Sequence, residues 1–262
     1  MPQFAANLTM MFTEHPFLDR FDAAAEAGFE HVEFLFPYDH PPEHVGERLR
    51  RNGLTQALFN LPAGDWSAGE RGLAVFPERV KELREGLERA LPYVEATGAR
   101  RVHLMAGIAP ASAAADAAYR DAICWCADRL VDRGVDLLLE PLNLRDNPGY
   151  YLSSFDLAAD LIRDLALRNV KLQFDLYHCQ IIHGDVTKRM QALMPLIGHV
   201  QIASVPSRHE PDDEELNYPF LWAELDRLGY GGYVGCEYRP RGRTEDGFGW
   251  FAPYRRRVGG DL

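Results

Sequence analysis

Four strand-like stretches of the chain each end in a side chain that offers an oxygen ligand: Glu140, Asp175, Gln201 and Glu237. The intervals between them are 35, 26 and 36 residues, each long enough for one helix and two loops. Parallel strands with such connections present their ends at one rim, so the four side chains should meet there. Carboxylate and amide oxygens suit Mg²⁺ or Mn²⁺ better than Zn²⁺ or copper. The sequence therefore predicts a divalent-metal site built from these four residues.

These residues and their neighbours also have simpler interpretations. Glu140 or Glu237 could instead cap the helix that follows its strand. His178 stands three residues after Asp175, where it could contact a substrate or have a purely structural role. Arg208 lies in the loop after the seventh expected strand; it could hold a substrate carboxylate in a bidentate pair, or form an ion pair at the surface. Function is favoured because active sites of such barrels lie at the C-terminal ends of strands.

The interior of the expected barrel is polar. Side chains alternate in direction along a strand, so the inward face that carries Glu140 and Asp175 can be extended to the other strands. On that face the sequence places Asn7, Glu33, His103, Lys171, Gln173, His199 and Tyr233. A structural core would be filled with Val, Ile and Leu, and buried charges must be paired or bound to metal. We therefore expect a functional site, with a ligand-free network of buried ion pairs as the alternative.

Strand-like apolar runs alternate with helical stretches along the chain. The strands are expected near residues 4–8, 30–36, 54–59, 101–106, 135–140, 169–175, 198–203 and 232–237. The helices are expected near 16–27, 42–52, 77–97, 114–133, 153–166, 185–196, 218–228 and 244–252. Eight such alternations in 262 residues predict an α/β fold, a (β/α)8 TIM barrel formed as a single domain over residues 1–262. An open doubly wound sheet would give a similar alternation.

Composition argues against several other classes of protein. The formal net charge is −11, whereas nucleic-acid binders usually carry a basic face, so no nucleic-acid partner is expected. No apolar run approaches the ~20 residues of a membrane span, and the N-terminus does not resemble a signal peptide. The four cysteines include no zinc-type pair and are expected to be free thiols. We expect a cytoplasmic protein without membrane contact, and the sequence is compatible with a homo-oligomer.

The longest connection without clear periodicity runs from Leu61 to Pro77. Loops of this length and glycine content usually cover a site, although a solvated surface excursion is the alternative. We expect residues 61–72 to close over a substrate, because the glycines permit hinge motion. Trp66 would exclude water, and Arg71 or Arg208 would hold a substrate carboxylate. The rival view is that Arg71 only pairs with a neighbouring acid at the surface.

Longer stretches around these residues resemble a known family. They are Phe4–Leu8, Val32–Tyr38, Asn60–Trp66, Ala68–Gly72, Glu140–Asn143, Asp175–His178, Gly198–Ala203 and Gly235–Tyr238. Over nearly its whole length the chain resembles the hydroxypyruvate isomerase and 2-oxo-tetronate isomerase family, within the xylose-isomerase-like TIM barrels. Residues 60–72 and 140–143 look more like the hydroxypyruvate enzymes, whereas residues 1–14 and 208–219 look more like the tetronate enzymes.

The resemblance implies an isomerase and gives roles to several of the candidate residues. The family's catalytic acid/base pair falls on Glu140 and Glu237, and its metal shell on these two with Asp175 and Gln201. The substrate-binding residues that we expect are His178, Arg208, Arg71, Asn7 and His103. The implied reaction is aldose–ketose isomerisation of a small hydroxy-keto acid, hydroxypyruvate to tartronate semialdehyde, by metal-assisted proton transfer through an enediolate. Isomerisation of 2-oxo-tetronate is the alternative. The enzyme would serve carbohydrate metabolism, in the first case glyoxylate metabolism.

Two other classes of function remain open. A metal-dependent phosphodiesterase of the endonuclease type would need several His ligands and a basic groove, which the four rim residues and the net charge of −11 disfavour. A non-catalytic sugar-acid binding protein would not need two glutamates facing one metal. Loss of turnover in EDTA would separate a metal-dependent enzyme from such a binding protein.

Overall fold

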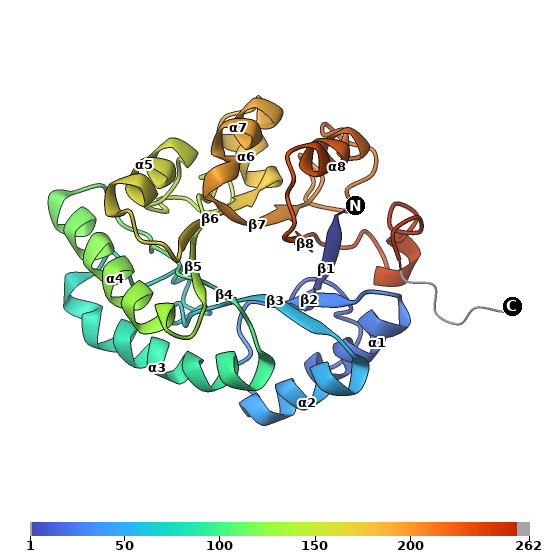
Figure 1. Cartoon of the computed structure of the whole chain (residues 1–262), viewed down its shortest axis with the longest axis horizontal. Helices are drawn as coiled ribbons and strands as arrows, with labels where there is room; N and C mark the ends of the chain where they lie inside the picture. The colour runs from blue at the N-terminus through green and yellow to red at the C-terminus, as the bar shows by residue number, and fades with distance from the viewer. Residues whose placement is uncertain (1, 256–262) are drawn as a thin grey trace, which may run out of the picture.

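The computed structural model describes residues 2–255, and within this range the chain closes into a parallel β-barrel (Figure 1). The strands are β1 (Gln3–Asn7), β2 (His31–Glu33), β3 (Thr55–Asn60), β4 (Arg101–His103), β5 (Asp136–Leu139), β6 (Val170–Asp175), β7 (Ile197–Ile202) and β8 (Tyr233–Cys236). Each strand pairs in parallel with the next, and β8 pairs with β1. The predicted (β/α)8 barrel is therefore confirmed, and the open doubly wound sheet is excluded.

Helices surround the barrel in chain order (Figure 1). They are α1 (Arg20–Glu26), α2 (Pro42–Asn52), α3 (Val80–Thr97), α4 (Ala113–Val131), α5 (Phe155–Leu165), α6 (Leu176–Ile182), α7 (Val186–Leu193) and α8 (Tyr218–Arg227). Gly53 and Gly98 end α2 and α3 in the left-handed conformation, with φ of 64° and 70°, because glycine has no Cβ to oppose it. Within the described residues, none of the helices combines the length and apolar character that a membrane crossing requires.

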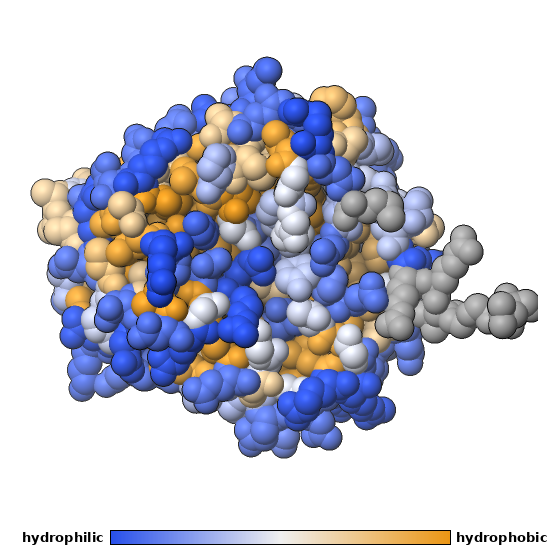
Figure 2. All heavy atoms as spheres, viewed as in Figure 1, coloured by the Kyte–Doolittle hydropathy of each residue, from blue (hydrophilic) through white to orange (hydrophobic). Residues whose placement is uncertain are grey.

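An apolar layer joins the strands to the helices. Val32, Phe174, Val200 and Val234 lie on the outward faces of their strands and are fully buried. Burial of such side chains stabilises the fold by about 25 cal/mol for each Å² removed from water. Hydrophilic residues cover most of the outline of the molecule, with hydrophobic residues in the recesses between them (Figure 2). The apolar layer thus anchors each strand and leaves its inward face free for polar groups.

One helix was not expected from the sequence. Residues 176–182, which the sequence pattern leaves unassigned, form α6 directly after β6. The Asp175 carboxylate accepts the backbone N–H of Tyr177 at 2.8 Å and so caps the helix. The strand therefore turns into a helix at the residue that was predicted to be a metal ligand.

The helix expected near residues 244–252 is reduced to a 3-10 turn at Thr244–Gly247, followed by further turns. Aromatic packing holds this segment in place, since the Phe251 ring stacks on the Phe29 ring with 4.1 Å between centroids. The segment lies in the ring of helices between α8 and α1 (Figure 1). Side-chain packing, rather than a regular helix, closes this side of the barrel.

Candidate active site and metal centre

The four predicted metal ligands lie at one rim of the barrel. Glu140 directly follows β5 and Glu237 directly follows β8, whereas Asp175 is the last residue of β6 and Gln201 lies in β7. Asp175 and Gln201 are register partners on neighbouring strands. All four side chains are buried. The parallel barrel therefore brings residues that are far apart in sequence to the C-terminal ends of four successive strands.

The three carboxylates converge with His178. Glu140, Asp175, His178 and Glu237 each offer a ligand atom, and these atoms lie within 4.8 Å of one another. Among the described residues, Glu140 Oε1, Asp175 Oδ2 and His178 Nε2 are buried without a hydrogen-bond partner. Buried carboxylate oxygens without donors are costly unless a cation compensates them. The donor set, rich in hard oxygen atoms, fits Mg²⁺ or Mn²⁺.

Both the nitrogen and the oxygen of the Gln201 side-chain amide form hydrogen bonds. Its Nε2 donates to Glu33 Oε1 at 2.8 Å, and its Oε1 accepts from Gln173 Nε2 at 2.6 Å. An amide oxygen has two lone pairs, so Oε1 retains one after this bond. The assignment of Gln201 as a metal ligand stays a prediction.

The hydrogen bonds of His178 determine which ring nitrogen carries the proton. Its Nδ1 accepts the backbone N–H of Asn143 at 3.1 Å. Burial, and then the charge of Arg208, hold the pKa of His178 well below its usual range, so the ring is neutral. A neutral ring that accepts at Nδ1 carries its proton on Nε2. That nitrogen lies 3.6 Å from Asp175 Oδ2 and 4.0 Å from Glu140 Oε1, where it can donate to a substrate rather than bind a cation.

Arg208 is part of the site and not of the surface. Its Nη2 donates to Glu237 Oε2 at 2.7 Å, and its side chain is only 13% exposed. The guanidinium also lies over the Tyr177 ring, 4.9 Å from the centroid. Arg208 adopts a left-handed backbone conformation with φ of 60°, held by a bond from the Arg239 N–H to its carbonyl at 2.8 Å. The loop after β7 thus turns this arginine inward.

The carboxylates oppose one another's ionisation. Burial raises the pKa of Glu140 well above its usual range, and the charges of Glu237 and Asp175 raise it further. Burial raises the pKa of Glu237 to about 8 and that of Asp175 to about 6, although the Arg208 guanidinium opposes both shifts. Without a cation the cluster therefore retains protons near neutral pH, and a bound cation would displace them.

Two further residues predicted to contact the substrate, His103 and Asn7, differ in their position relative to the cavity. His103 ends β4 and lines the cavity, with Nδ1 3.4 Å from Glu140 Oε2. Burial lowers the pKa of His103 to about 3, so it is neutral. Asn7 donates to Glu33 at 2.9 Å and is absent from the described lining of the cavity. A substrate contact stays a prediction for both residues, and the structure gives Asn7 a second role as a partner of Glu33.

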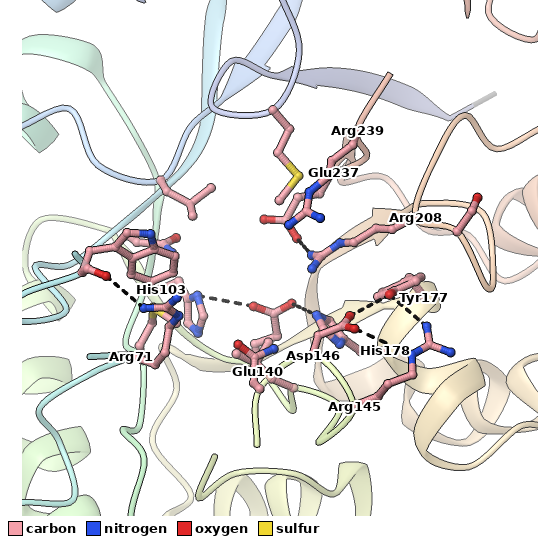
Figure 3. Close-up of a pocket in the computed structure, with 18 of the residues that line it drawn as sticks. Arg71, His103, Glu140, Arg145, Asp146, Tyr177, His178, Arg208, Glu237 and Arg239 are labelled. Carbon is pink, nitrogen blue, oxygen red and sulfur yellow. Dashed lines mark hydrogen bonds and ion pairs between the residues drawn. The ribbon is translucent and has the colours of Figure 1, made fainter. Parts of the chain in front are cut away.

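A cavity of about 420 Å³ opens above the carboxylates. Arginine side chains from several loops lie around it, as Figure 3 shows for Arg71, Arg145, Arg208 and Arg239. Its floor carries Glu140 and Glu237. The arginines suit a small anionic ligand, and the glutamates suit a metal ion. The cavity therefore fits a small anion whose other oxygen atoms can bind that metal.

Comparisons with known proteins agree with this geometry. The xylose isomerase-like TIM barrel model matches residues 21–254. The chain belongs to this family. The chain is 51% identical to 2-oxo-tetronate isomerase of Cupriavidus necator. The alignment covers 97% of this chain and 99% of that relative. The chain is 42% identical over 97% of its length to hydroxypyruvate isomerase of Escherichia coli, of which 100% is covered. The expected family relationship is confirmed, and the chain is an isomerase.

Solved structures extend the comparison. A crystal structure described as AP endonuclease, family 2, from Brucella melitensis superposes with a TM-score of 0.96 at 49% identity, covering 98% of this isomerase and all of that chain. D-psicose 3-epimerase of Clostridium cellulolyticum superposes with a TM-score of 0.72 at 17% identity, covering 93% of the isomerase and 87% of that chain. The second likeness shows the fold alone.

The loop after β3 lies at the mouth of the isomerase cavity. The Arg71 guanidinium lies 3.7 Å from the centroid of the Trp66 ring, and its Nη1 donates to the backbone oxygen of Glu70 at 2.7 Å. The Glu70 carboxylate pairs instead with Arg79, with Nη2 and Oε2 3.1 Å apart. Both Trp66 and Arg71 line the cavity. Among the described residues Arg71 thus has no carboxylate partner, and the expected closure of the loop stays a prediction.

Sequence reasoning missed a network beside His178. Tyr177 donates its hydroxyl to Asp146 at 2.6 Å, and Arg145 donates to the Tyr177 oxygen at 3.0 Å. Tyr177 stands inside the stretch that was singled out for Asp175 and His178, so its neighbourhood was a usable signal. Arg145 and Asp146 lie in a loop with no periodic pattern, and only the fold brings them to the cavity.

Proposed function

We propose that the protein isomerises a small 2-oxo-3-hydroxy acid by moving hydrogen between two neighbouring carbons. The observation that carries this proposal is the position of Glu140 and Glu237. Both belong to one buried group of metal-ligand candidates, and both line a cavity that also carries arginines. Acid/base chemistry needs two such positioned groups, and an anionic substrate needs the arginines.

We place 2-oxo-tetronate first among the substrates and hydroxypyruvate second, which reverses the order favoured by the sequence motifs. The relatives named 2-oxo-tetronate isomerase at 51% and 46% identity support this order, against 42% for the E. coli hydroxypyruvate isomerase. The two substrates share the same reacting carbons, and the tetronate adds one hydroxymethyl group. A cavity of about 420 Å³ accommodates that extension.

We assign the metal-ligand role to Glu140, Asp175, Gln201 and Glu237, with Mg²⁺ or Mn²⁺ as the ion. The unpartnered oxygens of Glu140 and Asp175 support this assignment. When bound, the ion would polarise the substrate carbonyl and stabilise negative charge on the substrate oxygens.

The side chains around the cavity would perform the remaining steps. One glutamate of the pair removes a proton from the hydroxyl-bearing carbon to give an enediolate, and the other returns a proton to the neighbouring carbon. The hydroxyl proton passes to the former carbonyl oxygen, so that the hydroxyl and carbonyl groups exchange places. Such positioned acid/base catalysis contributes about 10²–10⁴-fold. His178 donates from Nε2 to a substrate oxygen, and Arg208 or Arg71 holds the carboxylate. Trp66 limits access of water.

The experiment is a substrate panel with product identification by NMR. Purified protein with Mg²⁺ or Mn²⁺ should convert 2-oxo-tetronate to its 3-oxo isomer faster than it converts hydroxypyruvate, and EDTA should abolish both reactions. In D₂O, proton transfer should place deuterium on the newly protonated carbon, whereas a hydride shift would leave that carbon unlabelled. No turnover of either acid with either metal would refute the proposal.

An endonuclease is the second candidate, because the Brucella melitensis structure of 49% identity is described as one. The described residues contain one group of four clustered metal-ligand candidates, with a single histidine. A multi-zinc phosphodiesterase needs more histidines, and the net charge of −11 opposes DNA binding. Incubation with duplex DNA that contains one abasic site, with Zn²⁺ or Mg²⁺, should leave the DNA intact.

We further place the protein in the cytoplasm, as an enzyme of carbohydrate metabolism with a small-molecule partner. The four cysteines, Cys124, Cys126, Cys179 and Cys236, are all free, as expected of a reducing compartment. A homo-oligomer remains compatible with this assignment. Size-exclusion chromatography with light scattering would determine the assembly.

A further inference from the structure

Glu33 lies inside the barrel beside the candidate metal centre, and no role described above uses it. Its side chain is 1% exposed. Its Oε1 accepts from Asn7 Nδ2 at 2.9 Å and from Gln201 Nε2 at 2.8 Å, and its Oε2 lies 2.7 Å from His199 Nε2. Strands β1, β2 and β7 are thus connected through one carboxylate.

Glu33 reaches Gln201 across the barrel. β2 and β7 are not neighbours, since β8 and β1 lie between them. The carboxylate passes over Gly235 of β8, where any Cβ would overlap with it. Glycine at this position therefore leaves the room that the Glu33 side chain occupies.

Contact with Glu33 fixes the orientation of the Gln201 amide. A carboxylate accepts hydrogen bonds, whereas an amide has a donor nitrogen and an acceptor oxygen. Gln201 must therefore present Nε2 to Glu33 and turn Oε1 away from it. Gln173 Nε2 donates to this oxygen at 2.6 Å, which is compatible with that orientation and leaves one lone pair of Oε1 for a cation.

We propose that Glu33 is a positioning residue of the metal centre, which keeps Gln201 Oε1 available as a ligand by accepting a hydrogen bond from Nε2. The inference rests on the proposed function in one respect, because it takes Gln201 as a metal ligand. Groups that orient a metal ligand commonly change metal affinity by about 10–100-fold when they are removed. Glu33→Gln keeps the shape but introduces an amide that can donate, so both orientations of Gln201 become acceptable.

The test is Mn²⁺ binding to the full chain, measured by isothermal titration calorimetry without substrate. We expect Glu33→Gln to weaken Mn²⁺ binding at least tenfold. Glu33→Asp keeps a carboxylate but withdraws it by one methylene, so it should weaken binding by a similar factor; it also replaces Glu33→Gln if that variant does not fold. Glu210→Gln is the matched control, because Glu210 is equally buried and bonds the Arg241 backbone N–H at 3.1 Å beside a different cavity. It should stay within threefold of wild type.

A double-mutant cycle separates orientation of Gln201 from a general effect of charge. In a Gln201→Ala background the effect of Glu33→Gln on the Mn²⁺ dissociation constant should shrink below threefold. An equal effect in both backgrounds, or wild-type affinity in Glu33→Asp, would overturn the proposal. If wild-type protein does not bind Mn²⁺, the metal assignment of the proposed function fails, and this inference fails with it. Wild-type binding that Glu33→Gln does not alter removes only this inference.

Discussion

The two halves of the barrel contribute different chemistry to the same cavity. At the ends of strands β5 to β8 lie four side chains whose oxygen atoms could bind a metal: Glu140, Asp175, Gln201 and Glu237. Strands β1 to β4 supply neutral side chains such as Asn60 and His103, and the loop that carries Trp66 and Arg71. Carboxylates that share one cation must be close together, and successive strands achieve this. In the proposed function, the opposite half is then left to cover the substrate with Trp66 and Arg71.

Removal of the acids from the second half should have the largest effect. Glu140→Gln and Glu237→Gln should each lower kcat by about 10³-fold or more, since the amide keeps the shape but cannot transfer a proton. Steady-state kinetics would measure kcat, and circular dichroism would show whether each variant is folded. Glu210→Gln is the control for loss of a buried carboxylate outside the cavity. A variant that keeps more than about a tenth of wild-type kcat, a loss below ~1.4 kcal/mol, would show that its residue is neither acid nor base.

Metal affinity of the second half should depend on pH. Below its raised pKa of about 8, Glu237 carries a proton that a cation must displace, and above that pH it does not. Mn²⁺ affinity should therefore rise with pH between about 6 and 8, roughly tenfold per pH unit for each proton displaced. Calorimetry in buffers of different ionisation enthalpy would count the released protons. Glu237→Gln should lower the slope of this profile by one displaced proton; an unchanged slope would contradict the assignment.

The comparison also shows what the sequence could predict. The strand ends of the second half each follow an apolar run, so Glu140, Asp175 and Glu237 were placed correctly at one rim by parity and spacing alone. The helix at 176–182 was missed because Asp175 serves as both strand end and helix cap. The network of Tyr177 with Asp146 depends on a loop conformation that no periodic pattern encodes.

The hydrogen-bond network inside the barrel was only partly visible in the sequence. Parity placed Glu33, Asn7 and His199 inward, but it could not show that Glu33 bonds to both of the others. The contact of Glu33 with His199 requires the space above Gly235, on a strand that separates these two partners. A glycine such as Gly235 adds nothing to the periodic pattern of the sequence. Its role becomes visible only when the closed barrel places the Glu33 carboxylate above it.

Gly235→Ala should disturb the contact by which Glu33 of β2 reaches Gln201 of β7. The new methyl group would overlap with the Glu33 carboxylate, and overpacking of this kind costs about 1–3 kcal/mol. Urea unfolding of metal-free protein would measure the loss of free energy of unfolding. Gly242→Ala is the matched control, because no atom lies within 4 Å of a Cβ at that position. Equal stabilities of the two variants would show that Glu33 can move aside without cost.

In the covering half of the barrel, loss of one arginine should weaken substrate binding. Arg71 lies on Trp66 at the mouth of the cavity and has no carboxylate partner among the described residues, so its charge is available to a substrate. A hydrogen bond to a charged group contributes ~1.5–3 kcal/mol, so Arg71→Ala should lower kcat/KM more than tenfold. Because the residue binds rather than reacts, KM should carry most of the change.

A matched control decides whether that loss is specific. Arg129→Ala removes an exposed arginine that pairs with Glu88 on the outer helices, where an ion pair contributes ~0–1 kcal/mol, and it should leave kcat/KM within about twofold. If Arg71→Ala behaves like Arg129→Ala, then Arg71 only stiffens its loop, and Arg208 becomes the carboxylate-binding candidate. Substrate binding would then belong to the same half of the barrel as the acids, and the division between the halves would not hold for recognition.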